Sequence, residues 1–201
     1  MVEAIGRGIL SGLVLATFIG PIFFAVIDLG LKGNVKGVAF ISCGTFVSDV
    51  LWVLSIYLAA KQIDKDSALM QGMYLAGGLV LLVLGLQNLL KSKSAESRTA
   101  MHLKGMWSLF VKGFLINSTN PNVFFFWFGA VMVAVHQYNN QAQMVLAHFA
   151  CALTVVFSTD FLKGYAASLL RPYIKPVTLT YLSRFSGVIL IYFGIKLMLF
   201  H

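Results

Sequence analysis

The chain has 201 residues, of which 59% are apolar and 11% charged, and its formal net charge is +8. Soluble proteins average roughly 45–50% apolar and about 25% charged residues, so this composition excludes a soluble globular domain and indicates an integral membrane protein. In a membrane protein, basic residues in short connections are topology signals, so the positive charge does not indicate a nucleic-acid partner.

The hydrophobic pattern predicts one all-α membrane domain over residues 1–201 with six helical spans. We expect them at about residues 4–30, 37–60, 68–90, 107–135, 143–170 and 178–200. The fourth and fifth are the clearest, because the chain has no Asp, Glu, Lys or Arg between Lys112 and Asp160, and this stretch is long enough for two spans of about 20 residues.

The first and fourth spans each contain a proline in an apolar run. In the first the proline follows a glycine, Gly20-Pro21, and in the fourth it follows a polar stretch, Asn117-Ser118-Thr119-Asn120-Pro121. A proline interrupts helical hydrogen bonding, and free backbone groups at membrane depth are tolerated where they line a cavity. We therefore predict that both helices are broken there, as in transporters that bind substrate at such breaks.

The two prolines also belong to a longer repeat. Pro21 and Pro121 lie one hundred positions apart, and Phe46-Val-Ser-Asp49 matches Phe157-Ser-Thr-Asp160 at an offset of 111. The matches give repeat one at about 4–90, a cytoplasmic loop at 91–106 and repeat two at about 107–200. Three is an odd number of spans, so the second copy enters the membrane from the opposite face, which predicts a 3+3 inverted repeat.

Asp49 is the first candidate for a coupling residue. It lies about twelve residues from each end of its predicted span, or roughly 17 Å of helix from either surface. An intramembrane charge is costly, so this carboxyl should face the bundle interior and either be protonated or have a partner. Coupling to protons or cations and a hydrogen bond between helices are both open.

Asp160 is the second candidate for coupling, with Lys163 three residues later on the same helical face. A functional role and a structural ion pair are both open for it. Asp28, seven residues beyond Pro21, is either a solvated helix end or a gate.

The residues beside the two breaks are the candidates for substrate binding. They are Thr17, Gly20, Pro21, Asn117, Ser118, Asn120 and Pro121. Polar residues between membrane helices also hold helices together, but freed backbone next to Asn117 and Asn120 favours substrate contact. The neighbouring aromatics Phe23, Phe24, Phe124, Phe125, Phe126 and Trp127 are interpreted as packing or lipid-facing residues.

We expect no cofactor and no metal site. Cys43 and Cys151 lack CxxC spacing and are interpreted as small buried apolar residues, and the four histidines are scattered. No nucleophile and base stand together, so an enzyme is not predicted.

These features together resemble the LysE/RhtB family of amino-acid exporters over nearly the whole chain. The residues that carry the resemblance are Gly20-Pro21-Ile-Phe-Phe, Gly30, Lys32, Gly33, Gly37, Gly44, Ser48-Asp49, Lys112-Gly-Phe-Leu-Ile-Asn117 and Asn120-Pro121. The resemblance implies a six-span transporter of the bacterial inner membrane that exports amino acids or related small metabolites, driven by a proton or cation gradient. The polar approach to Pro121 departs from the family's usual apolar one, and the residues before Pro21 differ from its common Pro-Gly-Pro form.

Three functions compete. The first is a secondary exporter of a small-molecule substrate such as an amino acid, with membrane lipid as its surroundings; the sequence is also compatible with a homo-oligomer. The second is a divalent-cation exporter that uses Asp49 and Asp160 as oxygen ligands. The third is a thiol–disulfide electron conduit, which would need a cysteine at each break, where this chain has Gly20 and Asn120.

The distribution of basic residues predicts the orientation. One side carries Lys32, Lys36, Lys91, Lys93, Arg98, Lys104, Lys112, Lys163, Arg171, Lys175 and Arg184, and the other carries Arg7, Lys61, Lys65 and Lys196. By the positive-inside rule, both termini lie outside the cytoplasm and the 91–106 loop lies inside.

This orientation can be tested by labelling cysteines with a membrane-impermeant reagent. In a variant with Cys43 and Cys151 replaced by Ala, a cysteine at Asn139 should react in intact cells, and a cysteine at Ser97 only after permeabilisation. The opposite accessibility would refute the orientation and leave the repeat untouched.

Overall fold

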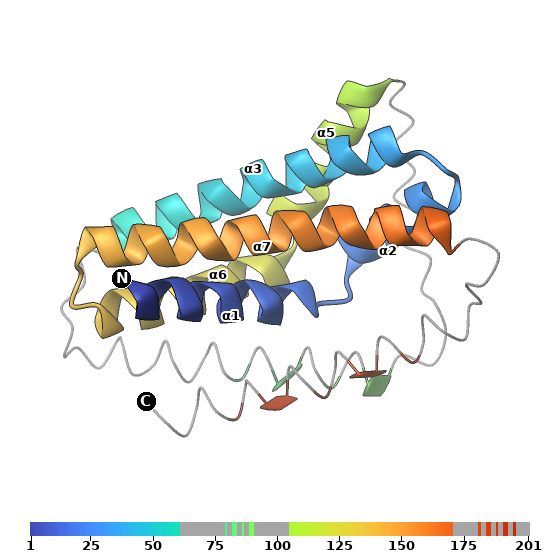
Figure 1. The fold of residues 1–201 in the computed structure, drawn as a ribbon. Coiled ribbons are helices and arrows are strands. Elements are labelled where there is room, and N and C mark those ends of the chain that lie inside the picture. The colour runs from blue at the N-terminus through green and yellow to red at the C-terminus, as the bar shows by residue number, and fades with distance from the viewer. Residues whose placement is uncertain are drawn as a thin grey trace.

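In the computed structural model, the described residues are 1–60 and 105–170, with thirteen isolated positions: 79, 82, 83, 86, 89, 90, 181, 184, 185, 188, 191, 192 and 195. Every regular element among them is a helix (Figure 1). The helices are α1 (Val2–Ala16), α2 (Pro21–Leu31), α3 (Val35–Ala60), α5 (Met106–Ser118), α6 (Pro121–Gln137) and α7 (Ala142–Leu169).

Within the described part of the chain, α3 and α7 are each long and apolar enough to cross a membrane, with 26 and 28 residues. The other helices form two bent pairs, and each pair meets the same criterion if it counts as one broken span. The bend is 75° between α1 and α2 and 66° between α5 and α6. The first, second, fourth and fifth predicted spans and both predicted breaks are thereby confirmed.

The third and sixth predicted spans, at 68–90 and 178–200, lie outside the described residues except for the isolated positions, which are helical. Along the chain, a bent pair and a long helix are followed by another bent pair and long helix. This order is the one a repeat requires, and the inverted relation between the halves stays a prediction.

The proline of each break begins a helix. Pro21 is the first residue of α2 after Gly20, whose backbone is extended (φ −128°, ψ −167°), and Pro121 is the first residue of α6 after Asn120. Proline suits the first helical position because its φ is already helical and the N–H it lacks would have no partner in the helix. Each break therefore presents the carbonyl end of one helix and the amide end of the next.

The long helix of each half packs against the broken helix of the other half. α3 contacts α5 and α6, whereas α7 contacts α1 and α2, and α3 also runs along α7 (Figure 1). The largest apolar core combines buried residues of α1, α3, α6 and α7. This packing brings the two breaks close to each other, since a Cβ atom on Gly20 would lie within van der Waals distance of the Asn120 side chain.

Two glycines let α3 and α5 approach closely. A Cβ atom on Gly44 would overlap the carbonyl oxygen of Phe110, and a Cβ atom on Gly113 would overlap the carbonyl oxygen of Ile41. Small residues at such crossings allow backbones to pack directly in membranes. Gly113 is one helical turn before Asn117, so this crossing sets the distance from Asn117 to α3.

We expect Gly113→Val to push α5 away from α3. Overpacking of this kind costs about 1–3 kcal/mol, so the midpoint of thermal unfolding in detergent should fall clearly. The matched control is Gly6→Val on α1, where an added Cβ atom meets nothing within 4 Å. Equal unfolding midpoints for the two variants would contradict close packing of α3 on α5.

Candidate functional site

A cavity of about 80 Å³ lies between the two breaks. Its lining residues come from α1, α2, α3, α5, α6, α7 and the two breaks: Leu15, Phe18, Ile19, Gly20, Pro21, Ile22, Phe23, Thr45, Asp49, Asn117, Asn120, Asn122, Val123, Val156, Asp160 and Lys163. The space exceeds what one water molecule needs, and its wall combines apolar side chains with amides, two carboxyls and one amine. A small polar molecule is the kind of occupant that such a wall fits.

The two breaks meet at this cavity, although they are one hundred positions apart in the sequence. A Cβ atom on Gly20 would lie 3.8 Å from Nδ2 of Asn120. The Asn120 side chain also caps α6, because its Oδ1 accepts a hydrogen bond of 3.1 Å from the backbone N–H of Asn122. The cap holds the Asn120 amide beside the other break.

Asp49 is near the middle of α3 and only 1% exposed. Its Oδ1 accepts two hydrogen bonds, from Nδ2 of Asn117 at 2.8 Å and from Nε1 of Trp127 at 2.7 Å. Both donors are neutral N–H groups, so Oδ1 acts as an acceptor whether the carboxyl is ionised or protonated. A proton on this group therefore belongs on Oδ2.

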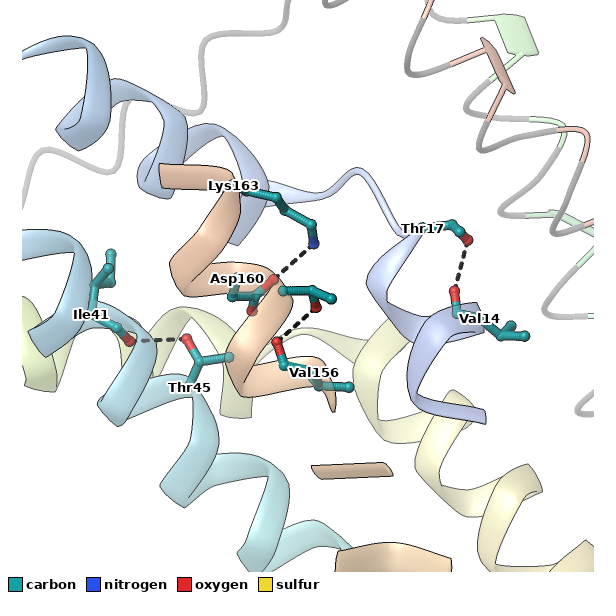
Figure 2. A network of polar contacts seen from close by, with 8 residues as sticks. Val14, Thr17, Ile41, Thr45, Val156, Asp160 and Lys163 are labelled. Carbon is teal, nitrogen blue, oxygen red and sulfur yellow. Dashed lines mark hydrogen bonds and ion pairs between the residues drawn. The ribbon is translucent and has the colours of Figure 1, made fainter. Parts of the chain in front are cut away.

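Asp160 and Lys163 form an ion pair on α7, which is one of the two alternatives that the sequence left open for Asp160. Nζ of Lys163 lies 2.8 Å from Oδ1 of Asp160, and the exposed fractions of the two side chains are 21% and 12%. Figure 2 shows the pair between the end of α1 at Thr17 and the face of α3 at Thr45. Both residues line the cavity, so the ion pair is also part of the candidate site.

Four of the seven predicted binding residues line the cavity, namely Gly20, Pro21, Asn117 and Asn120. The other three are not among its lining residues. The hydroxyls of Thr17 and Ser118 donate to the backbone carbonyls of Val14 at 2.7 Å and Leu115 at 3.3 Å, and Pro121 is exposed at the start of α6. Figure 2 shows the bond from Thr17 to Val14.

Two further candidates lie away from the cavity. Asp28 accepts a hydrogen bond of 2.6 Å from Nζ of Lys32, and the two side chains are 60% and 66% exposed. This is an ordinary ion pair at the end of α2, which favours the solvated helix end over the gate. Cys43 is exposed and Cys151 half-buried, in contrast to the prediction that both are buried, and neither lines the cavity.

Trp127 is the site residue that the sequence analysis missed. Its interpretation as a packing residue is confirmed, because it is fully buried in the largest apolar core, but it also donates its indole N–H to Asp49. The available signal was chemical, because an indole N–H at membrane depth needs an acceptor and Asp49 is the one acidic residue of the second span. Phe23 also lines the cavity, whereas Phe125 is 37% exposed.

The chain is similar to known proteins over most of its length. Residues 13–200 match a family model described as LysE type translocator. The chain is 26% identical over 190 residues to a protein of Bacillus subtilis (strain 168) named "Putative amino acid efflux protein YcgF", and the match covers 92% of this chain and 90% of that protein. No solved structure matches the chain.

The bond from Trp127 to Asp49 can be measured through stability. Trp127→Phe keeps the aromatic ring and removes the donor, and loss of a partner from a buried polar group costs about 1–3 kcal/mol, so the unfolding midpoint should fall. In an Asp49→Ala background the same change should have a clearly smaller effect. Trp52→Phe is the matched control, because no hydrogen-bond partner of the buried Trp52 indole nitrogen is found in the described part of the chain. Equal effects of Trp127→Phe in both backgrounds would contradict the bond.

Proposed function

We propose that this chain, which belongs to the LysE type translocator family, is a secondary transporter that exports an amino acid or a related small metabolite in exchange for protons. The observation that carries the proposal is the buried Asp49 carboxyl in a polar cavity between two helix breaks. Broken helices at the membrane midplane hold substrate and coupling ion together in many transporters.

The cavity has groups that complement both ends of a zwitterion. The amide end of α2 begins at Pro21 beside Gly20, and in the described structure no side chain caps it, in contrast to α6. The amide end of a helix carries a partial positive charge, which favours a substrate carboxylate. The carboxyls of Asp160 and Asp49 provide acceptors for an ammonium group.

We assign the binding and release of the proton to Asp49. Its Oδ1 is held by Asn117 and Trp127 in either charge state, which leaves Oδ2 to gain and lose the proton as the cavity opens to each side. At the membrane midplane a carboxyl is stable only when it is neutral or has a partner. The charge of Asp49 would therefore depend on whether the cavity is open to water.

The competing functions fit this cavity less well. The ammonium group of Lys163 would repel a divalent cation bound between Asp49 and Asp160. A thiol–disulfide conduit needs thiols at the substrate path, and Cys43 and Cys151 do not line the cavity. The carboxyls and the amine that line the cavity favour a small molecule with one positive and one negative group.

We place the protein in the bacterial inner membrane with both termini outside the cytoplasm, because its basic residues are concentrated in the connections of one side. The packing of α3 on α5 and α6, and of α7 on α1 and α2, supports an inverted repeat of three spans. In that arrangement the cavity lies where the two halves meet.

Asp49→Asn tests the coupling. Asn can keep Oδ1 as the acceptor for Asn117 and Trp127 and resembles the protonated acid, but it cannot release a proton. We expect the variant to insert and to exchange amino acid across the membrane, but to lose uptake driven by a pH gradient. The measurement uses proteoliposomes and radiolabelled alanine, threonine, leucine and lysine, with the gradient imposed in either direction.

The matched control is Asp28→Asn, which alters an exposed carboxyl away from the cavity and should leave gradient-driven uptake unchanged. Full gradient-driven uptake by Asp49→Asn would show that Asp49 is structural and would refute the proposed coupling.

A further inference from the structure

We infer that the ion pair of Lys163 and Asp160 opens to bind the substrate, and that Lys163 selects molecules with a free carboxylate. The inference rests on the proposed transport of a small zwitterion. When substrate enters, its carboxylate replaces Asp160 on Lys163, and its ammonium group takes the place of Lys163 at Asp160. The pair is thus the resting form of the binding site.

The surroundings of the pair set it apart from an ordinary ion pair on a helix surface. The Lys163 and Asp160 side chains are 21% and 12% exposed and line the cavity, whereas Lys32 and Asp28 form a pair of similar spacing that is 66% and 60% exposed. Exposed pairs of this kind contribute little to stability. Charged side chains are costly in a cavity between membrane helices. An ion pair in that position therefore indicates a role other than stability.

The hydrogen-bonding capacity of the pair leaves room for a substrate. An ammonium group has three donors, and Lys163 directs one of them to Oδ1 of Asp160 at 2.8 Å. The carboxylate of Asp160 has acceptor capacity beyond that one bond. Because the residues are one helical turn apart on α7, their side chains can separate by changes of rotamer without moving a helix.

Charge balance then determines which molecules can enter. An empty cavity needs Lys163 and Asp160 to neutralise each other, because either charge alone would be buried without a partner. A zwitterion supplies a new partner to both groups. An amine without a carboxylate would leave Lys163 beside a second cation, and a carboxylate without an amine would leave Asp160 beside a second anion.

The test compares acids with their carboxamides. The full-length protein is reconstituted, and exchange of labelled alanine, threonine, leucine and lysine is competed with each unlabelled amino acid and with its carboxamide. In the unaltered protein the acids should compete and the carboxamides should not. Lys163→Met should weaken competition by the acids roughly 10- to 100-fold, as expected for loss of a charged hydrogen bond, and should leave the carboxamides unchanged or improved.

Lys163→Arg should keep the preference for acids, because it keeps the cation. Lys32→Met is the matched control, because it breaks only the exposed ion pair with Asp28. It should change neither the competition by the acids nor the competition by the carboxamides. Should Lys163→Met fail to insert, the double variant Lys163→Met with Asp160→Asn leaves no unpaired charge, and it should insert and lose the preference for acids.

An unchanged ratio of acid to carboxamide competition in Lys163→Met or in the double variant would overturn the role of Lys163 and leave the proposed function intact. Absence of exchange for all four amino acids in the unaltered protein would overturn the proposed function, and with it this inference.

Discussion

The arrangement depends on one constraint, which is that backbone freed at a helix break inside a membrane needs a neighbour to cover it. Each break is covered by the long helix of the other half, because α3 packs on α5 and α6 while α7 packs on α1 and α2. Gly44 and Gly113 permit this packing between α3 and α5 by direct approach of their backbones. The two breaks lie close together, so Gly20 and Asn120 are neighbours and a polar cavity lies between the breaks.

The two carboxyls of the cavity have partners of different kinds, and the difference is the basis of the two roles that we propose for them. Asp160 is held by the cation of Lys163, and the ion pair is neutral as a whole. Asp49 is held by the neutral N–H groups of Asn117 and Trp127, which serve both charge states of its carboxyl. A group whose charge is not fixed by a counter-ion is the better proton carrier, and a group with a counter-ion is the better site for exchange with a charged substrate.

Local features of the structure could be predicted from the sequence, and contacts between helices mostly could not. Pro21 and Pro121 act on their own helices, so both breaks could be predicted, and Lys163 lies within one turn of Asp160, so the ion pair was one of the alternatives that the spacing offered. Thr17 and Ser118 were expected at the substrate, but near a helix end a hydroxyl readily bonds a carbonyl of the preceding turn, as both do here. The bond from Trp127 to Asp49 joins residues 78 positions apart and depends on how α6 crosses α3, which no local pattern specifies.

The two sets of bonds also differ in what must move when they break. Asp160 and Lys163 belong to one helix, so a substrate can part them by rotation of side chains alone. The donors to Asp49 come from α5 and α6, so its bonds tie α3 to both halves of a broken helix. Hydrogen bonds to a carboxylate are roughly twice as strong as those to a neutral acid, so protonation of Oδ2 weakens both ties at once. Under the proposed coupling, proton binding at Asp49 would loosen the junction of α3 with α5 and α6 beside the cavity, and this would give a physical route from the charge of Asp49 to the opening of the site.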